Sequence, residues 1–551
     1  MKKLIIIIGI MLILPGLCFA GGSTLTGVSF TSIPPTPLND IGDPGFEGFG
    51  VGICPKTNVT LATYQISPLN RHDFTWHDNH GNYITDSGSV IVWVPKFYYR
   101  IGHVDNPTYA LHGLNSIDIK GIYDFEDTGA ANAAGYALHR AFIDGGVEKD
   151  GFFRDKYTDS SMTWGAGTVA GSVKNGNPIS THADHNPVAG LTACSDNKYY
   201  EAVNAPKARD GVDGAVNASS IWFCSSIFIE DALAKLSLAH GQAAVSTANC
   251  AWYHATYNYP KGNNNDALKD TDDTTTVFTS DGYSNCGKTG SGATFAKTTH
   301  NGQNCGIADL NGNMYRIAIG MTCIATSPEI EAMSQTNPCE ITITGHGKVT
   351  GDYIQVDSIT QADWVGAKDK LWQITKTGDD TFTIGFDASG FGTPYDAGTD
   401  PGTVTLGSFY VAKEATAMKD FTSGNSLATD HWGATGVTAM MQEITVPMKS
   451  GAAYALRFGN GNTQVFSEAT SGDDWLCACM GMPISGDSIS TTGTNLFGKD
   501  YFYQYIRDQL CVRWGGCWSN GSNAGVWYRH LNYYRTFSDN YVGFAAACYL
   551  D

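Results

Sequence analysis

Charged residues are scarce in this chain, and their balance is acidic. Asp, Glu, Lys and Arg make up 16% of the 551 residues, and 34 basic against 53 acidic side chains give a formal net charge of −19. Non-specific binding to nucleic acid or to anionic lipid needs clustered cations, so this composition disfavours both. Long charged tails and coiled coils are disfavoured as well, because both are rich in charged residues.

Long apolar runs are absent beyond the first twenty residues. Lys2 and Lys3 precede an apolar run over residues 4–17, and Ala20 closes the segment. The run is shorter than the roughly 20 residues that span a bilayer, and the pattern predicts a cleavable secretion signal over residues 1–20. A retained anchor and lipidation at Cys18 are the alternatives. We therefore expect an exported protein in the periplasm, outside the cell or on its surface.

Metal-binding cysteine spacing is also missing. The chain has 14 cysteines, of which all but Cys18 follow the predicted signal. An oxidising destination permits disulfides, and the odd number leaves one thiol unpaired or available to another chain. The closest pair, Cys477 and Cys479, does not match zinc spacing. We expect disulfides of undetermined pairing and no metal bound by cysteines.

The arrangement of apolar residues and the 64 glycines predict a loop-rich chain with many short strands. Residues 21–50 are rich in Gly and Pro and predict an extended arm, while residues 89–100 predict a strand. Apolar residues at 3.6-residue spacing predict a helix over 229–241 with Gly241 as its stop. Residues 339–406 alternate apolar and polar positions between Gly-Asp turns, which predicts an inserted all-β unit.

The C-terminal segment 513–549 has a distinctive composition. It contains no Lys or Glu; ten of its 37 residues are aromatic, and 17 are Tyr, Ser, Gly or Asn. Antibody paratopes share this composition, because Tyr offers a large contact area for few rotatable bonds. Residues 529–541 show no period of 2 or 3.6, which predicts an exposed loop surface, although simple core packing is an alternative. Residues 542–550 predict a buried final strand.

Two motifs resemble the formylglycine-generating (sulfatase-modifying) enzyme family. GIADLNGNMYR at 306–316 resembles the family signature G-x-x-D-x-x-G-N-V-x-E, and RWGGCW at 513–518 resembles its later R-G-G-S-W strand. Residues 91–100 resemble its V-W-I-P strand, and 151–157 resemble the strand that follows. Within this family, the C-terminal segment looks most similar to the variable proteins of diversity-generating retroelements, which include phage tropism determinants and bacterial surface proteins.

The resemblance implies an α+β protein with a C-type-lectin-like fold of the formylglycine-generating-enzyme type. The lectin-like domain would be discontinuous, covering residues 51–338 and 407–551. A small β-barrel-like domain at 339–406, similar to a recurrent phage tail module, would be inserted into it.

Departures from the enzyme pattern indicate a protein without catalytic activity. The enzymes carry a reactive C-x4-C pair, but the corresponding positions here are about Asn520 and Gly525. Without a thiolate the oxidase chemistry is missing. Arg316 replaces an acidic residue beside the family's calcium site, where a cation would repel Ca²⁺. We expect no metal and no cofactor, and Asp309 reads as part of a turn with side-chain caps.

The resemblance also implies diversification by adenine-directed mutagenesis, mostly of Asn codons, whose products never include Trp, Lys, Glu, Gln or Met. The positions expected to vary and to face the ligand are Cys517, Ser519, Arg529, His530, Tyr533, Tyr534, Thr536, Phe537, Asp539 and Tyr541. The expected framework positions are Trp514, Gly515, Gly516, Trp518, Gly525, Trp527, Gly543 and Phe544.

The sequence therefore predicts a secreted or surface-displayed binding protein whose Tyr-rich surface contacts a protein or glycan on another cell or particle. Nucleic acid is not an expected partner, and a membrane would be reached only through an anchor. Alternatives are a phage tail-fibre or adhesin component with a fixed tip, and a sulfatase-modifying-type oxidase, which the missing cysteine pair disfavours. His182 and His185 are three residues apart in a polar stretch and are expected to be exposed loop residues rather than metal ligands.

Overall fold

The computed structural model describes most of the chain from residue 88 to residue 417 and much of its C-terminal part. The described residues are 24–26, 65–67, 75–76, 83–84, 88–113, 116–121, 124–149, 151–243, 266–270, 274–300, 306–417, 419, 440–444, 502–521 and 524–549. The predicted signal at 1–20 lies outside them. The predicted arm at 21–50 is described only at β1 (Thr24–Thr26).

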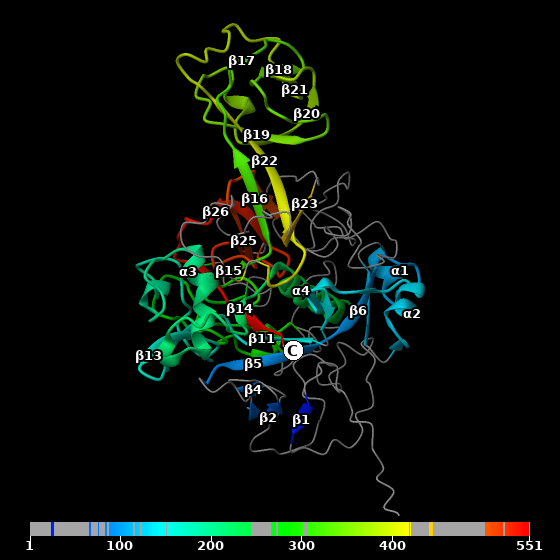
Figure 1. The fold of residues 1–551 in the computed structure, drawn as a ribbon, viewed down its shortest axis with the longest axis vertical. Helices are drawn as coiled ribbons and strands as arrows, with labels where there is room; N and C mark the ends of the chain where they lie inside the picture. Colours follow the sequence, from blue (N-terminus) through cyan, green and yellow to red (C-terminus); the bar gives the residue numbers. More distant parts are fainter. Residues whose placement is uncertain are drawn as a thin grey trace, which may run out of the picture.

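Two sheets build most of the main unit (Figure 1). The first has the strand order β14 (Trp222–Cys224), β28 (Ala546–Cys548), β11 (Gly151–Asp155), β5 (Val90–Pro95), β4 (Tyr83–Ile84) and β3 (Thr75–Trp76). The second has the order β24 (Phe502–Gln504), β26 (Arg529–Tyr534), β25 (Leu510–Trp514), β15 (Tyr315–Ala318) and β27 (Val542–Gly543).

Smaller elements complete the main unit. A three-stranded sheet has the order β7 (Ile117–Gly121), β6 (Phe97–Ile101) and β8 (Ala137–Leu138). Three strand pairs are β1 with β2 (Gln65–Ser67), β9 (Ile143–Asp144) with β10 (Val147–Glu148), and β12 (Ser160–Trp164) with β13 (Gly167–Gly171). The α-helices are α1 (Tyr109–His112), α2 (Thr128–Ala133), α3 (Tyr199–Asn204) and α4 (Ile227–Ala243). Single 3₁₀ turns cover Arg140–Phe142, Val188–Gly190, Ala205–Asp210, Val212–Gly214, Phe295–Thr298 and Val365–Ala367.

The helix α4 lies in the main hydrophobic core, and the prediction of a helix over 229–241 is confirmed. Every described side chain from Ile227 to Ala239 is buried, as expected for a helix that is surrounded by other elements. The predicted stop at Gly241 is wrong, because the helix continues to Ala243. One glycine costs only about 1 kcal/mol inside a helix, which does not end a helix held by packing.

The predicted strand over 89–100 forms two strands in different sheets. β5 pairs with β4 and β11, whereas β6 pairs with β7 and β8. The change occurs at Pro95 and Lys96. Proline has no amide hydrogen for the ladder, so it marks the end of β5.

The predicted inserted unit has its own hydrophobic core, and Figure 1 shows it projecting from the main unit. Ile330 and Met333 belong to this core, so the unit begins before the predicted boundary at residue 339. Its sheet has the order β16 (Met321–Thr326), β22 (Thr403–Ala412), β19 (Tyr353–Asp357), β20 (Lys370–Lys376), β21 (Thr381–Ile384), β18 (Cys339–Thr342) and β17 (Ala332–Met333), and β23 (Met441–Ile444) also pairs with β22.

The strands of this unit follow one another in the series β22, β19, β20, β21, β18 and β17, and Glu329, just before β17, forms an antiparallel bridge with Thr403 at the start of β22. The β-barrel-like shape stays a prediction, and β22 continues beyond the inserted unit into the main unit. Its first residues pair with β19, and its later residues pair with β16 and β23. One strand thus belongs to both units.

The predicted α+β class is confirmed: the described elements are mostly strands, with four α-helices. Among the helices that the structure describes, none combines the length and apolar character that crossing a bilayer requires.

A buried cluster of His139 with Asp231 and Lys235 of α4 predicts how stability depends on pH. His139 Nδ1 accepts the amide hydrogen of Ala141, so the ring proton is on Nε2, which lies 2.9 Å from Asp231 Oδ2. Lys235 donates to the same carboxylate oxygen. Burial lowers the pKa of His139 to about 4, against the opposing hydrogen bond to Asp231, so the folded state favours the neutral ring.

We expect His139 to contribute a loss of stability as the pH falls from 6.5 towards 4. The unfolded chain takes up the His139 proton below about pH 6.5, whereas the folded chain resists protonation until about pH 4, which costs about 2 kcal/mol at pH 5. Urea unfolding at pH 7.5 and pH 5 measures the loss. His139→Gln should show a flatter profile, and the difference between the two proteins isolates His139. Identical profiles would contradict the expectation.

Candidate ligand-binding surface

The C-terminal surface is built on β25, β26 and the turn that follows. β26 pairs with β25 on one side and β24 on the other, and the β25 register shifts between Cys511 and Arg513. Residues 535–541 then cross to β27, which pairs with β15. The prediction of a loop over 529–541 is therefore wrong for its first half, which is a strand, while residues 535–541 are irregular.

Aromatic rings form a continuous path in which five rings are exposed or half-buried and two, Tyr315 and Trp518, are buried. Neighbouring rings have centroids 4.1–6.3 Å apart, with tilted, stacked or edge-on contacts that are typical of favourable aromatic pairs. In order, the path runs through Tyr534, Phe537, Tyr533, His530, Tyr315, Tyr541 and Trp518. The sequence prediction placed five of these seven at the surface, and the fold brings them together.

A buried arginine supports the middle of this path. The Arg513 side chain is fully buried, and its guanidinium carbon lies 3.9 Å from the ring centre of Tyr533 and 4.7 Å from that of Phe537. These two ring faces hold the guanidinium through cation–π contacts. Burial and the charge of Arg513 lower the pKa of His530 to about 3, which leaves that ring neutral at pH 7.

The ten predicted ligand-facing residues divide into exposed, half-buried and buried groups. The exposed group is Ser519, Tyr534 and Thr536. The half-buried group is His530, Tyr533, Phe537, Asp539 and Tyr541. Cys517 and Arg529 are only 2% and 1% exposed, so both are corrected to interior positions.

The interior environment explains both corrections. Cys517 lies beside Ser519 under the start of the segment, and burial raises the pKa of its thiol to about 11. Arg529 lies over the ring of Trp514 and donates to the carbonyl oxygen of Val526 at 3.1 Å. Arginine stacks well on aromatic faces. The Arg529 guanidinium therefore packs on Trp514 inside the protein and does not face a ligand.

All eight predicted framework residues are buried, including three tryptophans. Tyr315 was not among the predicted site residues; its hydroxyl donates to that of Tyr528 at 2.9 Å. Tyr315 was part of the motif at 306–316, but the family pattern leaves that position unspecified. Only the pairing of β15 with β25 and β27 shows that its ring joins the surface path.

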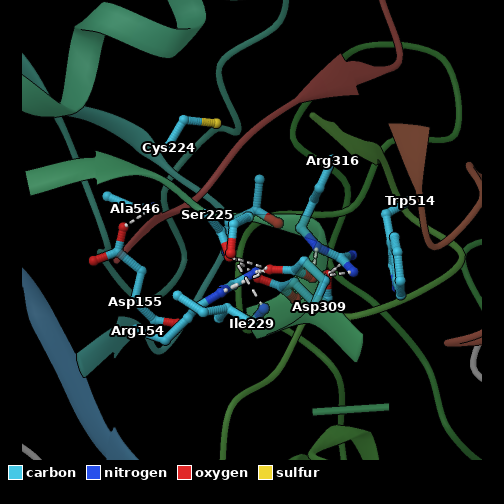
Figure 2. Close-up of polar contacts among 12 residues, drawn as sticks. Arg154, Asp155, Cys224, Ser225, Ile229, Asp309, Arg316, Trp514 and Ala546 are labelled. Atoms are coloured by element: carbon cyan, nitrogen blue, oxygen red, sulfur yellow. Dashed lines mark hydrogen bonds and ion pairs between the residues drawn. The ribbon is translucent and has the colours of Figure 1, made fainter. Parts of the chain in front are cut away.

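A buried ion-pair network connects β11, α4 and β15, and Figure 2 shows the side chains of Arg154 and Arg316 in it. Arg154 donates to one oxygen of the Glu230 carboxylate and Arg316 to the other, with N–O distances of 2.9 Å each, and Ser225 donates to the same carboxylate at 2.8 Å. Burial opposes ionisation of Glu230, but the two arginines outweigh it and lower its pKa to about 2. Arg316 is thus a buried ion-pair partner of Glu230 and not a residue of an exposed loop.

Asp309 caps distant segments rather than its own turn. Its carboxylate accepts amide hydrogens from Gly290 at 2.8 Å and Thr158 at 3.2 Å, while its backbone carbonyl accepts from Arg316 at 2.7 Å. Burial raises the pKa of Asp309 to about 6, although the two amides oppose the shift. The side-chain cap predicted for its own turn is therefore wrong, because the carboxylate joins this segment to the loops of Gly290 and Thr158 instead.

The expectation of an exposed His185 is wrong. Its side chain is 1% exposed and contacts Asp281, while the side chain of His182 is 36% exposed. The ligand atoms of His185, Asp281 and Cys286 lie within 4.8 Å of one another, close enough to hold a metal ion. All eight described cysteines are buried and free: Cys194, Cys224, Cys286, Cys323, Cys339, Cys511, Cys517 and Cys548. The expected disulfides therefore do not join any two of these described cysteines.

No protein-family model matches the chain, and no curated protein is significantly similar to it in sequence.

Proposed function

We propose that this chain is an exported, non-enzymatic binding protein whose aromatic path around β26 contacts a macromolecular ligand. The observation that carries the proposal is the path itself, which joins exposed Tyr534 to half-buried rings on a buried framework. Interfaces draw most of their binding energy from a few such aromatic anchors. A protein or glycan on another cell or particle fits this surface, which offers ring faces and Ser, Asn and Thr hydrogen-bonding groups.

A C-type-lectin-like fold of the formylglycine-generating-enzyme type is part of the proposal. In its support, the two motifs that carry the family resemblance lie side by side: Arg316 of β15 pairs with Trp514 of β25. The Gly312 amide also donates to the Gly515 carbonyl at 2.9 Å. Absence of oxidase chemistry is supported by Cys517, because a buried thiol with a raised pKa is a poor nucleophile.

Diversification of the surface by a retroelement is the further part of the proposal. Eight of the ten predicted variable residues are exposed or half-buried, while the predicted tryptophan framework is buried. Substitution at most of the eight would change the surface with little effect on the core, whereas Tyr533 also covers the buried Arg513 guanidinium. Sequencing the 3′ end of the gene in many cells of one lineage tests this. Changes clustered in codons 519–541 beside a near-copy template support it, whereas a uniform segment without a template favours a fixed adhesin or tail tip.

We expect Tyr534→Ala to weaken ligand binding about 30-fold while leaving the melting temperature nearly unchanged. Its ring is 48% exposed, so truncation removes contact area for the ligand but little core packing. Ligands captured from glycan and surface-protein arrays by the parent protein provide the binding assay. Tyr353→Ala, in the inserted unit, is the matched control and should bind as the parent does.

Tyr533→Ala should behave differently, because its ring also covers the Arg513 guanidinium. Both binding and melting temperature should fall in that variant. Unchanged binding by Tyr534→Ala would contradict the proposal that this surface binds the ligand. An equal loss of binding by the Tyr353→Ala control would show that the effect is not specific to this surface.

A further inference from the structure

We propose that His185, Asp281 and Cys286 form a zinc-binding site that fastens three loops behind the aromatic path. Their ligand atoms lie within 4.8 Å of one another although His185 and Cys286 come from separate loops of the sequence. The side chains of His185 and Asp281 are 1% and 0% exposed, and Cys286 is fully buried. The proposal is independent of what the protein binds on its surface.

The donor set selects the class of metal. An imidazole nitrogen, a carboxylate oxygen and a thiolate sulfur are the three ligand types that zinc combines in proteins. Calcium and magnesium prefer oxygen ligands only, so the sulfur disfavours them. With the thiol and the carboxyl deprotonated, the site carries two negative charges, which a divalent ion neutralises inside the protein.

The hydrogen bonds of His185 leave a lone pair directed at the site. Its Nδ1 lies 2.5 Å from the Asn540 carbonyl oxygen, which can only accept, so Nδ1 carries a proton. In the neutral ring Nε2 is then an acceptor, yet it lies 2.7 Å from another acceptor, Asp281 Oδ2. Two facing acceptors require a positive charge between them, either a second proton or a metal ion. A backbone carbonyl on the far ring nitrogen is the usual orientation of a metal-binding histidine.

The other buried His–Asp pair in the described residues shows the contrast. His139 Nδ1 accepts the Ala141 amide, so Nε2 donates its proton to Asp231 and the pair needs no further charge. No thiol joins that pair; Lys235, a cation, does. Both pairs consist of a histidine and an aspartate. Only at His185 does the ring nitrogen without a proton face the aspartate, and only there does a cysteine supply a third ligand atom.

Packing holds the three ligands in place. The His185 ring stacks on Tyr283 with centroids 4.2 Å apart, and Asn186 donates to Asp281 Oδ2 at 3.2 Å. Cys286 packs with Met314 and Trp518. Ligands that are oriented before the metal arrives lose little conformational freedom on binding, which favours high affinity.

Metal binding would fasten the part of the surface that follows β26. The Asn540 carbonyl that orients His185 lies between Asp539 and Tyr541, and the Asn540 side chain donates to the Tyr283 hydroxyl at 2.9 Å. The ion would therefore hold the end of the aromatic path against the loops at 180–186 and 280–287.

Cobalt is the spectroscopic probe for this site, because it replaces zinc and reports a thiolate ligand. The full purified chain is stripped with a chelator and titrated with Co²⁺. We expect about one ion per chain, a thiolate-to-cobalt charge-transfer band, intense tetrahedral bands in the visible range, and displacement by Zn²⁺. Zn²⁺ should also raise the melting temperature, since it binds only the folded chain.

Variants separate this site from other thiols. Cys286→Ser should abolish the charge-transfer band and the zinc-induced rise in melting temperature. Cys339→Ser, a buried cysteine in the core of the inserted unit, is the matched control and should retain both. Should Cys286→Ser fail to fold, Asp281→Asn conserves size and should lower zinc affinity at least about 10-fold. The proposal is overturned if the parent shows no thiolate band at saturating Co²⁺, or if Cys286→Ser keeps it.

Discussion

Glu230→Gln should lower the free energy of unfolding by about 3–5 kcal/mol. Glu230 is the shared partner of Arg154 and Arg316, and all three side chains are buried. The neutral amide leaves two buried guanidinium groups without a counter-charge between them. Because one partner is removed while the others stay in place, the desolvation cost of both arginines is retained.

Chemical unfolding followed by tryptophan fluorescence measures this loss, since Trp222, Trp514 and Trp527 are buried in the same unit. Glu148→Gln is the matched control, because Glu148 pairs with Lys96 and is 41% exposed. The control should change stability by less than about 1 kcal/mol. A Glu230 variant as stable as this control would show that the network contributes no net stability.

Arg209→Met should cost a similar amount at neutral pH, about 3–5 kcal/mol. Arg209 donates to both Asp155 oxygens at 2.7 Å and to Asp159 at 2.8 Å, and all three side chains are fully buried. Burial alone raises the pKa of a carboxyl, yet Arg209 holds that of Asp155 below its usual value, whereas the pKa of Asp159 stays raised by burial. Removing the cation leaves two acids facing each other.

The sign of the pH dependence identifies this mechanism. Without Arg209, both carboxyls should have a folded-state pKa above the unfolded value near 3.9, so the variant is most stable below that value and loses stability as pH rises through the folded pKa. The stability gap between variant and parent should therefore narrow between pH 7 and pH 5. Arg507→Met, at a partly exposed arginine 3.9 Å from Asp357, should show a small gap that is constant with pH. A pH-independent gap for Arg209→Met would contradict the explanation.

Periodic local patterns in the sequence predicted the elements that depend on local packing. The apolar spacing over 229–241 predicted α4, because a buried helix repeats its contacts every turn. The same kind of pattern did not predict β26. Its inward positions include Arg529 and Leu531, and the buried arginine interrupts the apolar alternation that would mark a strand.

Contacts between distant segments could not be predicted from one sequence. His185 and Asp281 are 96 positions apart, and neither flanking segment shows a metal-binding spacing. Tyr315 joins the aromatic path only because β15 lies between β25 and β27. By contrast, the composition of residues 513–549 indicated the segment that carries most of the aromatic path, because residue types can be read without knowing any long-range contact.

The shared strand β22 lets a force on the inserted unit act on the main unit, because β22 pairs with β19 in the former and with β16 towards the latter. Residues Leu406–Val411 pair in continuous register with β16, so a pull along the strand axis loads those hydrogen bonds together rather than one at a time. β16 in turn packs beside β25, the strand that carries Arg513. Tension on the inserted unit would thus be passed through two adjacent strands to β25, the strand that carries Arg513.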